Sequence, residues 1–266
     1  MRELGEPASF LYAAALDTES AERAGFRFGA KGTHSSRTLM LPELAAALET
    51  TPPSAARGEY ATAIIEDNCL GKTTAATRRL TSQRLAELYA LDPRVPIFRT
   101  LRRLWSTDEQ SRPLLALQCA MARDPLLAAT AESIADLPIG REFQRDDVRA
   151  ALRRAVGDRL NDAVLEKVVR NAASSWSQSG HLQGRTFKRR CRVHASPASV
   201  TYGLYLARIA GFRGIQLFTS GWISLLDCTP PQARQLALEA KRSGLIDFRT
   251  AGEVVDISFE RLERAG

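Results

Sequence analysis

Proline residues divide the middle of the chain into short segments, and this division limits the folds that the chain can adopt. The intervals between them carry apolar residues at helical spacing, and the prolines are Pro42, Pro52, Pro53, Pro93, Pro96, Pro113, Pro125 and Pro138. Because proline is tolerated in the first turn of a helix and ends a helix elsewhere, the intervals predict short helices. Connections of a few residues favour antiparallel neighbours in a bundle. We therefore predict one helical domain over residues 41–138, after a poorly defined lead over residues 1–40.

Beyond Gly140 the same order of elements is predicted twice. A helix ends at Ser179-Gly180 and another ends 64 residues later at Ser243-Gly244, with a β-hairpin expected directly after each. Glycine after a helix supplies the left-handed conformation that ends it. Helices followed by a hairpin are typical of winged-helix domains, a variant of the helix-turn-helix. The repeated Ser-Gly pair is too short to establish an internal duplication.

These patterns together predict the fold class. We expect a mainly α-helical protein in which a helical bundle is followed by helical units with small β-hairpins. Residues 139–195 are predicted to form helices plus a basic hairpin, and residues 196–266 a winged-helix-like unit. Trp105, Trp176 and Trp222 stand among apolar residues of predicted helices, so we expect them in the core.

Positive charge is concentrated in one part of the chain. The 266 residues carry 37 basic and 30 acidic side chains, and residues 141–195 alone hold 13 basic and 6 acidic ones. The rest of the chain is therefore neutral in sum. Arginine accounts for 32 of the basic residues, and its planar guanidinium suits bidentate contact with phosphate. A coding bias would explain the excess of arginine but not its clustering.

The densest cationic segment is the first predicted hairpin. Its return strand is expected over residues 186–193, and its five cations are Arg185, Lys188, Arg189, Arg190 and Arg192. A ribbon with this many like charges repels itself unless an anion binds, so we predict that these side chains contact the phosphate backbone of double-stranded DNA. Side chains alternate across a strand, which places Lys188, Arg190 and Arg192 on one face. A solvated hairpin with salt bridges to nearby acids is the alternative.

A second cationic surface is predicted over residues 78–103, where seven arginines meet only Glu87 and Asp92. It begins on the helix predicted over residues 74–91, which has Thr74 as its N-cap. Arg78 and Arg79 share one face of this amphipathic helix. The apolar face is formed by Thr77, Leu80, Leu88 and Leu91. Arg78 and Arg79 are the second choice for phosphate contact.

Motifs for nucleotide and metal binding are incomplete. Gly71-Lys72-Thr73-Thr74 is similar to the end of a P-loop, but Glu66 stands where that motif requires glycine. We therefore expect that the protein neither binds nor hydrolyses ATP. Cys191, His194 and His181 lack the second pair of ligands of a structural zinc site. The sequence predicts no cofactor and no metal.

A metal-dependent nuclease is the less favoured alternative. Asp227, Glu239 and Lys241 occur in the order that such enzymes use to hold Mg²⁺ and to position water. Those side chains must project from adjacent strands, whereas residues 232–243 are predicted to be helical. We therefore expect a protein that is not an enzyme.

The predicted location is the cytoplasm. No charge-free stretch approaches the ~18 to 20 apolar residues that a membrane helix needs, and the N-terminal residues do not resemble a signal peptide. The four cysteines, Cys69, Cys119, Cys191 and Cys228, show no paired spacing, which fits a reducing compartment.

Several segments of the chain, within about residues 26–195, are similar to a known family. The most specific runs from Glu66-Asp67-Asn68 through Leu70 and Lys72 into Ala76-Thr77-Arg78-Arg79. The others are Gly29-Ala30 with Ser35-Ser36-Arg37 and residues 44–48, the helix over residues 126–137, and residues 165–182 with their Ser-Gly end. On these segments the chain resembles the BrxA-like family, a small accessory component of BREX bacteriophage-exclusion systems. The long N-terminal lead and the unit from residue 196 onward depart from the family pattern.

The resemblance implies a mostly helical, non-enzymatic protein that binds DNA. Its implied partners are the methyltransferase and the ATPase of the same defence system, and no catalytic residue carries over. A scaffold whose cationic faces dock on acidic partner proteins is the main alternative to DNA binding. Salt-sensitive binding to plain duplex DNA would separate these two interpretations.

Overall fold

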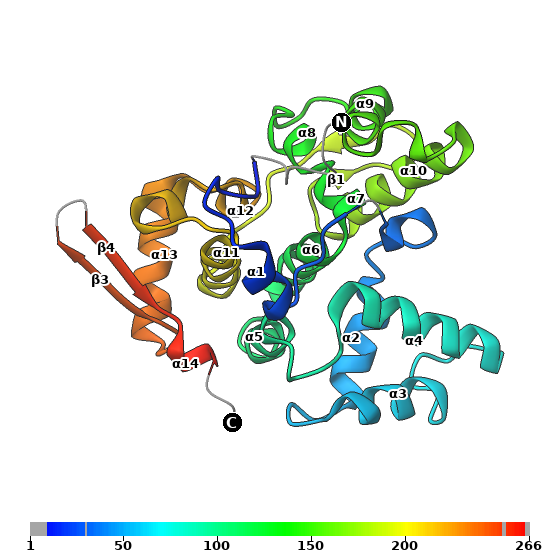
Figure 1. Ribbon diagram of the computed structural model, residues 1–266, viewed down its shortest axis with the longest axis horizontal. Helices are drawn as coiled ribbons and strands as arrows, with labels where there is room; N and C mark the ends of the chain where they lie inside the picture. Colours follow the sequence, from blue (N-terminus) through cyan, green and yellow to red (C-terminus); the bar gives the residue numbers. More distant parts are fainter. Residues whose placement is uncertain (1–9, 30, 252–253, 264–266) are drawn as a thin grey trace.

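The computed structural model describes residues 10–29, 31–251 and 254–263, and it is mainly α-helical with two small antiparallel hairpins (Figure 1). The predicted fold class is confirmed. Buried residues from Leu11 to Leu262 form one continuous hydrophobic core, to which all the predicted segments contribute. Trp105, Trp176 and Trp222 are each at most 2% exposed, as expected for core residues. No helix in the described ranges is long and apolar enough to cross a membrane.

The centre of the molecule is α6 (Arg112–Arg123), which packs against α5 (Pro96–Trp105) and α11 (Pro197–Ile209) (Figure 1). Every residue of α6 from Leu114 to Arg123 is buried. A helix that is apolar on nearly all sides can be satisfied only inside a core. This helix therefore joins the first half of the chain to the second.

The first half supplies one group of helices. They are α1 (Thr18–Ala24), α2 (Leu41–Thr50), α3 (Arg57–Ile65) and α4 (Ala75–Tyr89), with a 3₁₀ turn over Thr33–Ser35 between the first two. Within the poorly defined lead, Thr18–Ala24 form a regular α-helix.

Helix α4 begins as predicted but turns a different face to the core. The Thr74 side chain accepts a hydrogen bond from the Thr77 backbone N–H, so Thr74 is the N-cap. Thr81, Leu85 and Leu88 are buried against α3 and α6, whereas Thr77 is exposed and Leu80 is 38% exposed. The predicted apolar face is confirmed only for Leu88 and Leu91, which are buried. On α4 the buried stripe runs at i, i+4 and i+7 from Thr81.

The first winged-helix-like unit follows α7 (Pro125–Ala128). It consists of α8 (Ala131–Ala135), α9 (Arg145–Val156), α10 (Asp162–Gln178), β1 (Leu182–Gln183) and β2 (Arg189–Arg190). An extended segment between α8 and α9 adds a third chain to the hairpin: Glu142 forms a β-bridge with Arg189, and Phe143 N–H donates to the Lys188 carbonyl at 2.8 Å. The order helix, strand-like segment, two helices and hairpin is that of a winged helix.

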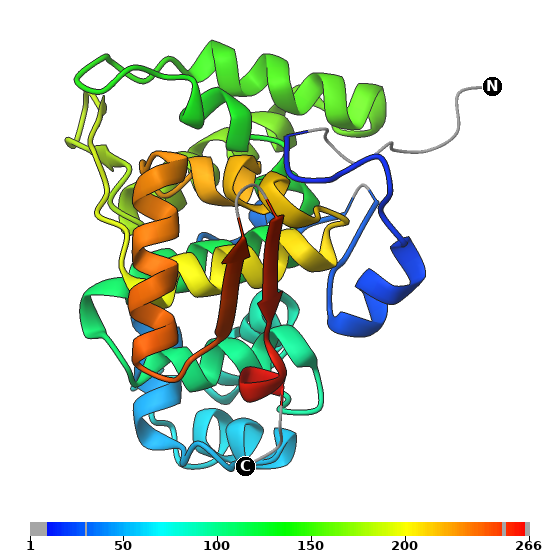
Figure 2. The ribbon, with the colours of Figure 1, turned by 90° about the vertical axis from the view of Figure 1, so that its left-hand side faces the viewer.

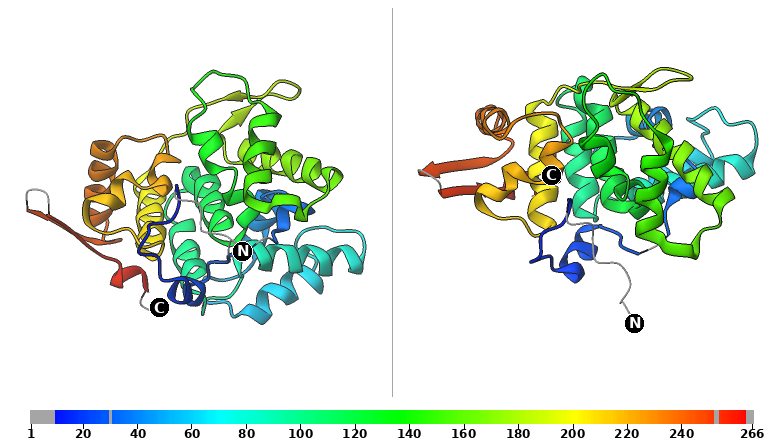
Figure 3. Two further views of the ribbon diagram at one scale, coloured as in Figure 1. Left: turned by 45° about the horizontal axis from the view of Figure 1, so that its top comes forward. Right: turned by 90° about the horizontal axis from the view of Figure 1, so that it is seen from above.

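The second unit consists of α11, α12 (Gly221–Ser224), α13 (Pro230–Arg242), β3 (Asp247–Ala251), β4 (Val254–Ser258) and α14 (Glu260–Glu263). The hairpin lies beside α13 at the edge of the molecule (Figures 2 and 3). Between α11 and α13 the chain forms a 3₁₀ segment, Gly214–Thr219, followed by α12. The second hairpin predicted after Ser243-Gly244 is present, and residues 252–253 between its strands lie outside the described residues.

Both units pass from helix to hairpin in the same way. Gly180 and Gly244 have φ values of 88° and 73°. Their backbone N–H groups donate to the carbonyls of Ser177 and Lys241, three residues earlier. The left-handed glycine predicted at each Ser-Gly pair is confirmed.

Candidate nucleic-acid interface

The basic hairpin is shorter than the sequence suggests. Its strands pair only at Leu182 with Arg190 and at Gln183 with Arg189. Gly184 opens the loop with a φ of 118°, and a Cβ atom there would lie 2.1 Å from the Phe187 carbonyl oxygen. The loop therefore folds back on itself directly after β1. The return strand expected over residues 186–193 is reduced to Arg189–Arg190.

Three of the predicted contact residues are exposed and carry uncompensated charge. Arg185, Arg189 and Arg192 are exposed, and none forms an ion pair with a carboxylate of the described chain. Arg189 and Arg192 donate only to carbonyl oxygens, those of Gly140 at 3.2 Å and Asp227 at 3.4 Å. Such side chains keep most of their charge available for an anion.

Lys188 has a partly structural role. Its ammonium group donates to Ser177 Oγ at 2.7 Å and to the Gly184 carbonyl at 3.2 Å. The side chain is half-buried, and it fastens the loop to the C-terminal end of α10. Neither partner is negatively charged, so Lys188 still adds to the positive potential of the hairpin.

Arg190 is not on the surface, and the prediction that it contacts phosphate is wrong. It is 1% exposed, and its guanidinium forms a bidentate ion pair with Asp227, with one contact at 3.0 Å. Its Nε donates to the Ile134 carbonyl at 3.0 Å. Because Arg190 faces inward, Lys188, Arg190 and Arg192 do not share an exposed face. The ion pair instead ties β2 to the turn between α12 and α13.

The exposed face of α10 extends the cationic surface beyond the hairpin. Ala163, Lys167 and Arg170 are exposed at i, i+4 and i+7, and Ser174 and Ser177 continue the same face to the point that Lys188 contacts. Neither Lys167 nor Arg170 has a carboxylate partner among the described residues. Sequence reasoning missed this face, although its period of 3.6 could have revealed it.

The second cationic surface carries less free charge than the sequence suggests. Arg84 and Arg94 form ion pairs with Glu87 and Asp92, and Arg102 is 8% exposed and donates to the backbone carbonyls of Leu48 and Thr51.

Arg78 and Arg79 are the two residues of this surface that are predicted to contact phosphate. Arg78 is half-buried and donates to the Glu66 carbonyl at 3.4 Å. Arg79 is exposed, without an ion pair in the described part of the chain. It stands at the rim of a cavity with three other arginines.

Neither a protein-family model nor a curated protein matches this chain. Functional residues are therefore assigned from geometry and charge.

The residues of the incomplete nucleotide, metal and nuclease motifs have structural roles or lie apart. Lys72 pairs with Glu43 at 3.0 Å. His181 is buried between Ser179 and the Leu225 carbonyl, and burial lowers its pKa well below the usual range. Asp227 is held by Arg190, whereas Glu239 and Lys241 lie on α13, so the nuclease arrangement is not assembled. Among the described residues no group of three or more His, Cys, Asp and Glu side chains could hold a metal ion.

Asn68 forms the joint between α3 and α4. It adopts a φ of 53°, and its Oδ1 accepts a hydrogen bond from the Lys72 backbone N–H at 2.8 Å. We expect Asn68→Ala to lower stability by about 1 to 2 kcal/mol, because alanine lacks the acceptor and disfavours left-handed backbone. Urea unfolding measures this cost. Unchanged stability together with lost DNA binding would contradict the structural role.

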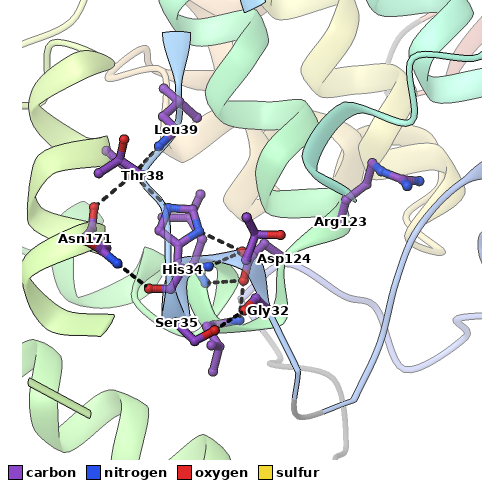
Figure 4. Close-up of polar contacts among 12 residues, drawn as sticks. Gly32, His34, Ser35, Thr38, Leu39, Arg123, Asp124 and Asn171 are labelled. Atoms are coloured by element: carbon purple, nitrogen blue, oxygen red, sulfur yellow. Dashed lines mark hydrogen bonds and ion pairs between the residues drawn. The ribbon is translucent and has the colours of Figure 1, made fainter. Parts of the chain in front are cut away.

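One buried network was not foreseen. His34 Nδ1 lies 2.7 Å from Asp124 Oδ2, and His34 Nε2 lies 2.7 Å from Ser175 Oγ. Figure 4 shows His34 beside Asp124, with Asn171 of α10 donating to the His34 carbonyl at 2.7 Å. The sequence offered no carboxylate near His34, since 90 residues separate it from Asp124.

His34, Asp124 and Ser175 are connected in the same way as a catalytic Ser-His-Asp triad, but the network is buried and has a structural role. His34, Asp124 and Ser175 are each at most 1% exposed. Ser175 Oγ also accepts from the Leu39 N–H at 2.8 Å and contacts the Asn171 carbonyl at 2.9 Å. A nucleophile must reach a substrate, and this hydroxyl is enclosed by protein. The network therefore fastens the segment over residues 33–39 to α10.

Proposed function

We propose that this protein is a non-enzymatic, DNA-binding accessory protein of a BREX-type phage defence system. In this proposal the first winged-helix-like unit binds the phosphate backbone of duplex DNA. The observation that carries it is a set of exposed cations without carboxylate partners among the described residues, on a hairpin and on the helix before it. They are Arg185, Arg189, Arg192, Lys167 and Arg170.

The order of elements supports a docking geometry. Helix-turn-helix domains place their second helix in the major groove, and α10 occupies that position after α9. Its exposed face presents Lys167 and Arg170 to the groove and its flanking phosphates. The hairpin loop would lie over the adjacent backbone, where Phe187, 69% exposed, is an apolar side chain among cations. Such side chains contact sugars or base steps in the minor groove.

The second unit provides an internal contrast. In its hairpin Arg249 lies directly opposite Asp256, and Asp247 forms an ion pair with Arg261 at 2.9 Å. Positive charge is therefore compensated there. The two units have similar element orders, but the unpaired cations favour the first one for DNA.

The defence role rests on the resemblance of the chain to the BrxA-like family. It implies the methyltransferase and the ATPase of the same system as partners. The proposed cytoplasmic location rests on the cysteine spacing and not on this resemblance. A scaffold that docks on acidic proteins would use the same cations, so binding to protein-free DNA is the decisive measurement.

A shift assay with duplex DNA, single strands and RNA at two salt concentrations tests the proposal. We expect duplex binding that weakens steeply with salt, since each phosphate contact adds about 0.9 to the slope of log affinity against log salt. Absence of duplex binding at low salt would favour the scaffold.

Removing the α10 cations tests the docking geometry. Lys167→Ala with Arg170→Ala is expected to lower the salt slope by roughly 1.8, because two phosphate contacts are lost. Both side chains are exposed, so thermal stability should be unchanged. An unaltered slope in this variant would remove α10 from the interface.

A further inference from the structure

A cavity with an arginine-rich wall lies away from the first winged-helix-like unit. It has a volume of about 530 Å³ and is bounded by α3, α4 and the turn after α4. These helices lie side by side in Figure 1. Four arginines line it, namely Arg27, Arg57, Arg79 and Arg123. Its size falls within the range of small-molecule sites, about 300 to 1,000 Å³.

The wall carries a net positive charge, because its four arginines outnumber its two acids, Glu87 and Asp92. Arg27, Arg57 and Arg79 are exposed at the cavity, and none forms an ion pair with a described carboxylate. The two acids in the wall are already engaged: Glu87 with Arg84, and Asp92 with Arg94. The wall therefore attracts an anion.

Arg123 gives this wall a fixed, buried charge. It is 7% exposed and donates only to backbone carbonyls, at 2.6 Å to Gly25, 3.0 Å to Glu87 and 3.3 Å to Ala86. Burial, together with the nearby charge of Arg27, lowers the pKa of Arg123 to about 10. A second cavity of about 370 Å³ shares Arg27 and Arg123 and adds Lys31. Positive potential thus extends along both hollows.

The same cavity also has an apolar side. Tyr60, Ile65, Leu91 and Val95 line it. The Tyr60 hydroxyl is buried and has no hydrogen-bond partner within the described structure. An unpaired buried hydroxyl lowers stability, and an acceptor on a ligand would offset that loss. A ligand that fits both sides carries a negative charge at one end and a flat, partly apolar group at the other.

We propose that this cavity binds a mononucleotide, with its phosphate held by Arg27, Arg57 and Arg79 and its base against the half-buried side chains of Ile65 and Val95. Guanidinium groups suit phosphate because they donate two parallel hydrogen bonds. This site is separate from the DNA interface, and it requires no P-loop. It does not depend on the proposed function.

Calorimetric titration of the full chain tests the site. The probes are the four ribonucleoside monophosphates and the four matching nucleosides. We expect at least one monophosphate to bind at least tenfold more tightly than its nucleoside, because the phosphate carries the contacts to arginine. Arg27→Ala with Arg57→Ala should weaken that binding at least tenfold.

Arg103→Ala with Arg242→Ala is the matched control. It removes the same number of exposed charges from α5 and α13, outside the cavity, and should leave nucleotide affinity within twofold. The proposal is wrong if no monophosphate binds at millimolar concentration, or if the control loses as much affinity as the cavity variant. It is also wrong if substitution of Arg185, Arg189 and Arg192 abolishes nucleotide binding, since the nucleotide would then occupy the DNA interface.

Discussion

Changing Arg185, Arg189 and Arg192 to glutamate is expected to weaken duplex DNA binding by about 100-fold or more at moderate salt. All three side chains are exposed and free of carboxylate partners in the described chain. Each should contact a phosphate, and reversal replaces each attraction by repulsion. The slope of log affinity against log salt should fall by roughly 2 to 3, as expected for three lost contacts. Fluorescence anisotropy with a labelled duplex at several salt concentrations measures both quantities.

The control for this variant reverses the same number of exposed arginines elsewhere. Arg103, Arg242 and Arg249 lie on α5, α13 and the second hairpin. Their change to glutamate alters the net charge equally and should reduce affinity much less. Circular dichroism verifies that both variants are folded. If the hairpin variant binds duplex DNA with unchanged affinity and slope, the charge serves a protein partner and the scaffold interpretation is preferred.

Arg190 is left out of this set, and it shows a limit of sequence reasoning. Periodicity placed it on one face with Lys188 and Arg192, but β2 is only two residues long and alternation did not extend past it. Its partner, Asp227, lies 37 residues away. A buried ion pair between distant residues leaves no local pattern. Charge density therefore located a cluster of cations but did not show which of its arginines face solvent.

Predictions from the sequence were most accurate for features that depend on one residue and its near neighbours. The glycine ends at Gly180 and Gly244, the Thr74 cap and the left-handed Asn68 all follow from the preferences of one residue and its near neighbours. The β-bridge between Glu142 and Arg189 cannot be predicted from such preferences, because it joins two segments 47 residues apart. The network around His34 is similar, since its parts lie in three separate segments.

The Asp124 carboxylate is the largest single contributor to stability that we expect in this network. It accepts hydrogen bonds from the His34 backbone N–H at 2.9 Å and from the Leu126 N–H at 3.0 Å, and it contacts His34 Nδ1. Gly32 permits this close approach, because a Cβ atom at that position would lie 2.0 Å from Asp124 Oδ1. Burial by itself would raise the pKa of Asp124, but His34 and the backbone donors lower it overall.

Asp124→Ala is therefore expected to destabilise the protein by about 3 to 5 kcal/mol, since it leaves buried donors and His34 without a partner. For a chain of this size the loss corresponds to a fall in Tm of roughly 6 to 20 °C. Asp158→Ala is the control, because Asp158 is fully exposed and its ion pair with Arg153 is long, at 3.8 Å. We expect this substitution to lower stability by less than about 0.5 kcal/mol. Equal Tm values for the two variants would contradict the role of the network.

The pH dependence of unfolding gives an independent check. A carboxyl group whose pKa is lower in the folded state stabilises the protein above its unfolded pKa, and this contribution disappears as pH falls through the folded pKa. The wild-type protein should thus lose stability below about pH 4. Asp124→Asn should be less stable near neutral pH but lose less on acidification, because its side chain does not titrate. If both proteins lose stability in parallel on acidification, Asp124 does not carry the ionised contact that its position beside His34 indicates.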